Sequence, residues 1–225
     1  YLINNSQTQL HLKKINKSKL ADNNIYGIKK LLNDHKYLEC EKQCKSFIRS
    51  NINSKNIYII LGFSLIKQNK FLKAFKNYKI ALKIYNNDED LLINLGDLLK
   101  NQGYYLKAIE QYKIILKINP ASIPALINIS NLYNLTSNYE EAAFFSSKII
   151  SLNSKLDKGF CNLGNAYFGM NKIEEAISMY NQGLIHNNKS SELNHNKALS
   201  LMLIKKYDAA IKIFEDGIKK NYLDN

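Results

Sequence analysis

The sequence predicts an all-α solenoid built from six antiparallel helical hairpins, and three observations support this fold. Only 9 glycines and 2 prolines occur in 225 residues, which favours helices joined by short turns. Columns of similar residues recur without an insertion at a period of about 34 residues, and such self-similarity is typical of stacked supersecondary units. Hydrophobic residues make up 45% of the chain, which is enough to fill the core between the stacked hairpins.

Two columns of small residues mark where paired helices approach each other. The first column lies on the second helix of each hairpin and contains Cys40, Ala74, Ala108, Ala142, Ala176 and Ala210. The other lies on the first helix of repeats two to six and contains Gly62, Gly96, Ser130, Gly164 and Ala198. In four of the six repeats an aromatic residue follows the first column by four positions, as Tyr78, Tyr112 and Tyr180 do, and we expect it to wedge between neighbouring helices. Since one hairpin cannot bury its apolar stripe alone, neighbouring repeats must supply the core.

The columns define six repeats between residues 21 and 224. Their predicted boundaries are 21–54, 55–88, 89–122, 123–156, 157–190 and 191–224. First helices are expected near 22–34, 56–68, 90–102, 123–136, 157–170 and 191–204. Second helices are expected near 37–50, 71–85, 105–118, 139–152, 173–186 and 207–220. Residues 1–20 fit the register poorly and are expected to be a poorly ordered lead-in or a short helix.

Charge and cysteine content narrow the class of protein. The net charge of +13 would suit a nucleic-acid partner, but Arg49 is the only arginine among 32 basic residues. Because nucleic-acid sites favour the bidentate contacts of arginine, that partner is disfavoured. Three cysteines without metal-ligand spacing indicate reduced, buried thiols and a cytoplasmic location. No apolar run is long enough to span a membrane. The chain begins with Tyr1 rather than Met, so a missing upstream targeting segment stays an open alternative.

The sequence shows no catalytic constellation. None of the four histidines pairs with another at a one-turn spacing within a helix, and no glycine-rich phosphate loop is present. Glu174 and Glu175 open a predicted helix, where acidic side chains suit the helix dipole. We therefore expect this segment to be no enzyme and to bind neither a metal nor a cofactor.

The repeat columns resemble those of the tetratricopeptide repeat family over about nine tenths of the chain. The third repeat carries the resemblance most clearly, with Leu95-Gly96, Tyr105, Ala108, Tyr112 and Pro120. The resemblance implies a right-handed superhelix whose first helices line a concave face that holds a partner protein. Chaperone-binding members grip a carboxylate with lysines and an arginine, but the matching positions here are Ile93, Asp97, Ile127, Glu192 and Asn196. A ligand of that carboxylate-clamp type is therefore not expected.

One polar column on the first helices has no evident packing role. It consists of Asn94, Asn128, Asn162 and Asn196, and Asp97, Asn131 and Asn165 lie one turn further along the same helices. It resembles the asparagine ladder of O-linked N-acetylglucosamine transferase repeat arms, which binds the backbone of protein substrates. Ile60 and Tyr26 interrupt it in the first two repeats, so any ladder is short. Asparagine is abundant in the chain, and a chance column is the alternative.

These observations favour a protein-interaction scaffold that binds a partner peptide in the concave groove. The alternative is the substrate-recruiting arm of a larger enzyme with a glycosyltransferase, sulfotransferase or oxygenase domain beyond Asn225. Self-association through the apolar end near Ile213 and Ile218 is also open. The sequence names neither the partner nor the oligomeric state.

Overall fold

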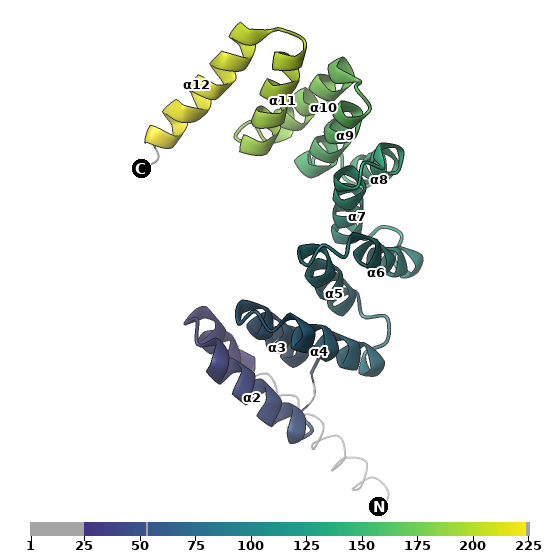
Figure 1. Ribbon diagram of the computed structural model, residues 1–225, viewed down its shortest axis with the longest axis vertical. Coiled ribbons are helices and arrows are strands. Elements are labelled where there is room, and N and C mark those ends of the chain that lie inside the picture. The colour runs from purple at the N-terminus through teal and green to yellow at the C-terminus, as the bar shows by residue number, and fades with distance from the viewer. Residues whose placement is uncertain (1–24, 53, 224–225) are drawn as a thin grey trace, which may run out of the picture. The chain divides into compact units, whose positions relative to one another are not determined.

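The structure is a computed structural model that describes residues 25–52 and 54–223. In these residues every regular element is a helix, and a helix at residues 25–33 precedes the eleven that follow (Figure 1). They are α2 (Tyr37–Arg49), α3 (Lys55–Lys67), α4 (Phe71–Ile84), α5 (Glu89–Asn101), α6 (Tyr105–Ile118), α7 (Ile123–Leu135), α8 (Tyr139–Leu152), α9 (Asp157–Gly169), α10 (Ile173–His186), α11 (Ser191–Leu203) and α12 (Tyr207–Leu223). The lead-in predicted for residues 1–20 lies outside the described residues.

The chain divides into two compact units, residues 1–102 and residues 103–225. In the N-terminal unit, α3 packs between α2 and α4, and α5 packs against α3 and α4. In the C-terminal unit each helix from α6 to α12 packs against the next along the chain. The first helices also touch one another there, α7 against α9 and α9 against α11. Consecutive hairpin packing confirms the predicted all-α solenoid.

The core of both units follows the predicted columns. The whole small-residue column of the second helices is buried, with side chains at most 1% exposed. The tyrosines four positions later are equally buried, which confirms the packing role expected for Tyr78, Tyr112 and Tyr180. At the degraded first repeat, Ile28 occupies the small-residue position and is also fully buried. The columns are therefore the contact surface of the hairpins.

Helix boundaries are set by caps and turns that repeat with the same period. The side chains of Asp88, Ser122 and Ser190 cap α5, α7 and α11 by accepting the backbone N–H of the third helical residue. Two residues after each first helix ends, a turn residue has a positive φ, and these residues lie one repeat apart: His35, Asn69, Gly103, Ser137, Asn171 and Lys205. Five of the six are not glycine, so helix packing holds them in a region that L-residues disfavour.

The predicted start of the first helix at residue 22 lies outside the described residues. From α2 to α12 the helices differ from the predicted ranges by at most three residues at either end, the largest difference being the extension of α12 to Leu223. At the C-terminal end Ile218 is exposed, whereas Ile213 is half-buried because it packs on the cluster of Ala198, Leu201 and Ala210. Among the described residues, no helix is long and apolar enough to cross a membrane.

Candidate functional site

The candidate site is built on the joint between Gly164 of α9 and Tyr180 of α10. A Cβ at Gly164 would overlap the Tyr180 ring, so the absence of a side chain lets the ring lie against the backbone of α9. The ring is 1% exposed, but the hydroxyl reaches the neighbouring residue of α9 and donates to Oδ1 of Asn165 at 2.8 Å. Burial raises the pKa of Tyr180, so the hydroxyl is neutral and remains a donor at physiological pH.

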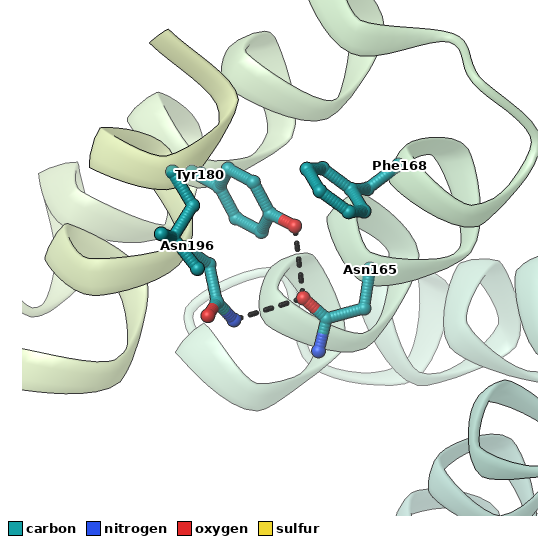
Figure 2. Close-up of a pocket in the computed structure, with 5 residues that line it drawn as sticks. Asn165, Phe168, Tyr180 and Asn196 are labelled. Atoms are coloured by element: carbon teal, nitrogen blue, oxygen red, sulfur yellow. Dashed lines mark hydrogen bonds between the residues drawn. The ribbon is translucent and has the colours of Figure 1, made fainter. Parts of the chain in front are cut away.

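A third helix completes the polar part of the site. Asn196 of α11 donates from Nδ2 to the same Oδ1 of Asn165 at 2.9 Å, as Figure 2 shows. Phe168 and Leu199 supply apolar walls, and together these five residues line a cavity of about 110 Å³. The site therefore combines three consecutive helices of the C-terminal unit.

The two amides keep hydrogen-bonding capacity that the fold does not use. Neither Nδ2 of Asn165 nor Oδ1 of Asn196 bonds to another described residue, and Figure 2 shows both outside the dashed network. If both amides were flipped, so that nitrogen and oxygen exchanged places, the pair would again leave one amino group and one carbonyl open. In either orientation the site offers one donor and one acceptor beside an apolar wall. A peptide backbone, with its C=O acceptor and N–H donor, can bind to both.

Asn162, a member of the predicted column, has a different role. Its side chain is 4% exposed, and its Nδ2 donates to Ser130 Oγ of α7 at 2.7 Å. Asn134 strengthens the same connection by donating from Nδ2 to the Asn162 backbone carbonyl at 2.9 Å. The small Ser130 side chain leaves room for the Asn162 amide, and its hydroxyl provides the hydrogen-bond partner that a buried amide requires. Asn162 therefore joins α7 to α9 and does not face open solvent.

The remaining predicted residues are dispersed over two units. In the N-terminal unit Asn94 donates to the Asp90 carbonyl of its own helix at 2.7 Å, and Asp97 forms an ion pair with Lys100 at 3.0 Å. In the C-terminal unit Asn128 is half-buried and Asn131 is exposed, both on α7. Of the seven residues singled out, the structure brings only Asn165 and Asn196 together at a cavity.

Sequence reasoning missed the apolar half of the site. Phe168 lies one turn after Asn165, and Leu199 lies one turn after Asn196, so the same offset recurs on α9 and α11. A search for amides alone passes over this pairing. The predicted packing role of Tyr180 is correct for its ring, which is buried, but it does not include the hydroxyl, which donates to Asn165.

The other metal-ligating and nucleophilic side chains of the described residues form no second site. Among these residues, no three His, Cys, Asp or Glu side chains cluster as metal ligands would. All three cysteines are free and buried. Burial raises the pKa of Cys161 to about 12, so this thiol is protonated and a poor nucleophile.

The chain matches a sequence-family model and several solved structures. The tetratricopeptide repeat model matches residues 89–122 and 158–184. A tetratricopeptide repeat protein from Parabacteroides merdae superposes with a TM-score of 0.77 at 20% identity, over 88% of this chain and 79% of that one. Residues 89–122 and 158–184 are therefore tetratricopeptide repeats, and the chain has the fold of tetratricopeptide repeat proteins. No curated protein matches it in sequence at a significant level.

Two further structures share this fold. One is a thermophilic protein from Thermus thermophilus, with a TM-score of 0.60 and 16% identity over 81% of this chain and 99% of that one. The other is MamA from residue 41 onward, from Desulfovibrio magneticus RS-1, with a TM-score of 0.67 and 16% identity over 76% and 97%. At such identities the likeness concerns the fold alone.

Proposed function

We propose that this tetratricopeptide repeat protein is an interaction scaffold that binds an extended peptide of a partner protein across α9 and α11. The observation that carries the proposal is the open amino group of Asn165 next to the open carbonyl of Asn196. An extended backbone presents a carbonyl and an N–H that these groups bind together. Because the contacts are to the backbone, they accept many peptide sequences.

The cavity beside the amides supplies an apolar contribution. Its volume of about 110 Å³ compares with the roughly 150 Å³ of engineered cavities that hold benzene, so a small aliphatic side chain fits. Leu199 is 39% exposed at its edge and would be covered by such a side chain. Peptides with one aliphatic residue next to the bound peptide group should therefore bind best.

The same binding path continues on α7. Asn131 is exposed and stands one repeat before Asn165, at the matching position of the previous first helix. Because α7 packs against α9, a peptide that leaves Asn165 in that direction passes this third amide. The N-terminal unit carries Asn94 and Asp97 at corresponding positions, and their part in peptide binding stays a prediction.

A displayed library of random peptides tests the proposal. The tightest binder is synthesised, and its Kd is measured against the wild type and against Asn165→Ala/Asn196→Ala. Each backbone hydrogen bond contributes about 1 kcal/mol net, so the double variant should bind roughly tenfold to a hundredfold more weakly. Methylating the peptide nitrogen that donates to Asn196 should cost about tenfold in the wild type and little in the variant.

The matched control is Asn181→Ala/Asn188→Ala, which removes two exposed amides on and just after α10. This control should bind the peptide as the wild type does. The site variant should melt at a somewhat lower temperature than the other two, because it removes the acceptor of the buried Tyr180 hydroxyl, so all Kd values are measured well below every melting temperature. If the control weakens binding as much as the site variant, or if the site variant binds normally, the first-helix amides are not the peptide site.

A further inference from the structure

A second surface lies on α4 in the N-terminal unit and takes no part in the peptide site. Within this helix, every residue of one face is either lysine or aliphatic. The face consists of Leu72, Lys73, Lys76, Lys79, Ile80, Lys83 and Ile84, all exposed, and is called here the basic-aliphatic face. At about 100° per residue these side chains cover an arc of about 140°. Helix α4 contains no acidic residue, so nothing on the helix itself offsets the four positive charges.

The lysines of this face have no ion-pair partner among the described residues. Nearby lysines are paired: Lys70 binds Glu41 at 2.8 Å, and Lys55 binds Asp88 at 3.0 Å. These carboxylates of the unit are thus engaged by lysines outside the face. The basic-aliphatic face keeps its full charge, and an anionic partner is the one that complements it.

The aliphatic side chains of the basic-aliphatic face are largely exposed and are not part of the core. Leu72 is 66% exposed, Ile80 is 53% exposed and Ile84 is 51% exposed. Ile80 and Ile84 lie one turn apart, and lysines flank all three aliphatic residues, so a partner that covers them must also accept the ammonium groups. The headgroup region of a lipid bilayer can take both kinds of side chain. Aliphatic side chains enter its hydrocarbon boundary, while the lysine side chains extend to the phosphate layer.

The side-chain types separate this partner from an acidic protein. Protein interfaces are enriched in arginine and aromatic residues and depleted in lysine. The basic-aliphatic face has no arginine and no aromatic residue. Lysine is a flexible point charge and does not require the fixed bidentate geometry that favours arginine. We propose that the basic-aliphatic face of α4 binds an anionic lipid surface, with the three aliphatic side chains in the headgroup region and the four lysines on lipid phosphates.

Helix α6 repeats part of the pattern and shows why α4 is the site. Leu106, Lys107, Lys117 and Ile118 stand one repeat after their counterparts on α4. Glu110, however, replaces the lysine at the centre of the face. The ammonium groups of two α6 lysines also lie over tyrosine rings, Lys107 over Tyr104 and Lys113 over Tyr133. The charge of α6 is therefore smaller and already partly engaged.

Flotation with lipid vesicles tests the inference on the full chain. Vesicles of phosphatidylcholine alone are compared with vesicles that contain about 30% phosphatidylserine, the anionic component of cytoplasmic leaflets. We expect binding to the anionic vesicles only, weakened by salt. Replacing all four lysines of the face by glutamine should lower the partition coefficient roughly tenfold or more. Leu72→Ser/Ile80→Ser/Ile84→Ser should also lower it, and most clearly at high salt, where the apolar contribution dominates.

The control removes the same charge elsewhere. Lys155, Lys189, Lys206 and Lys212 are exposed in the C-terminal unit, and their joint replacement by glutamine should change vesicle binding about twofold at most. Equal losses in both quadruple variants would overturn the inference in favour of attraction by net charge. Binding to an acidic polyglutamate peptide without binding to vesicles would overturn it in favour of an acidic protein partner. Absence of wild-type binding to both probes would also reject it.

Discussion

The same helix joint occurs in both units with different polar chemistry. Gly62 and Tyr78 pair in the N-terminal unit as Gly164 and Tyr180 do in the C-terminal unit. In each pair a Cβ on the glycine would overlap the tyrosine ring, and both rings are at most 1% exposed. The Tyr180 hydroxyl donates to Asn165, whereas the buried Tyr78 hydroxyl has no hydrogen-bond partner among the described residues.

The cause is the residue that follows each glycine. Asn165 follows Gly164 and accepts the hydroxyl, but Phe63 follows Gly62 and has no acceptor to offer. Burial and the nearby carboxylate of Asp97 together raise the pKa of Tyr78, so its hydroxyl keeps its proton. The comparison shows that packing and surface chemistry are set by adjacent positions. A binding face can thus change between repeats while the joint beneath it stays the same.

Filling the two glycine positions should have the largest effect. We expect Gly62→Val and Gly164→Val each to destabilise its unit by about 3 kcal/mol, because the added side chain overlaps a buried ring. Urea unfolding followed by helix content and by hydrogen exchange of each unit measures the effect. A loss in only one of the two variants would mean that the joints are not equivalent.

Acid should affect the N-terminal unit more than the other. Burial opposes ionisation of Glu41, but hydrogen bonds from Lys45 at 2.5 Å and Lys70 at 2.8 Å outweigh it and lower the pKa to about 2. A depressed pKa stabilises the fold above the unfolded value near 4.5, and this contribution is lost as pH falls toward 2. No carboxylate among the described residues of the C-terminal unit is buried in this way.

Glu41→Gln isolates this effect. The variant should be less stable by about 2 kcal/mol at pH 7, and its stability should fall less between about pH 5 and pH 2. Thermal unfolding at several pH values measures both quantities. Parallel pH profiles for wild type and variant would show that the acid sensitivity arises elsewhere.

Removing the two hydroxyls compares the joints directly. Tyr180→Phe should cost about 1 kcal/mol, because Asn165 loses a donor and the site loses its anchor. Tyr78→Phe should be neutral or slightly stabilising, since a buried group without a partner is removed. The two variants are measured side by side by thermal unfolding. A similar cost in both would mean that the Tyr78 hydroxyl is satisfied in solution.

Phe63→Asn should transfer the amide of the C-terminal joint to the N-terminal one. The new acceptor should bind the Tyr78 hydroxyl, while the contact of the Lys67 ammonium with the Phe63 ring, at 5.2 Å, is lost. The net gain is small, about 0.5 kcal/mol, and it should disappear in the Tyr78→Phe background. A gain that persists in that background would have a source other than the hydroxyl.

The fold was predictable because the repeat length is constant and no insertion interrupts it, so the alignment of one repeat fixes the positions of the helices in all the others. The predicted ranges 139–152 and 173–186 coincide with α8 and α10. The site was predictable only in part, since equal spacing does not give equal surroundings. Asn196 meets a neighbouring amide, Asn162 meets the small Ser130 and is buried, and Asn94 bonds to its own helix. Which of these outcomes occurs depends on the residues around each asparagine, on its own helix and on the neighbouring first helix. The spacing of one column carries no information about them.

The left-handed turn residues suggest how heat resistance could be raised without touching either proposed surface. Lys205 has a φ of +61°, and its side chain has no hydrogen-bond or ion-pair partner among the described residues. Replacing it by glycine should add about 0.5 kcal/mol, because relief of backbone strain exceeds the entropy cost, and a melting curve measures it. The turns recur through the whole array, so glycine at several of them should add up, as changes at distant sites do. The turn residues between paired helices thus allow the melting temperature to be raised in small steps while both proposed binding surfaces stay unchanged.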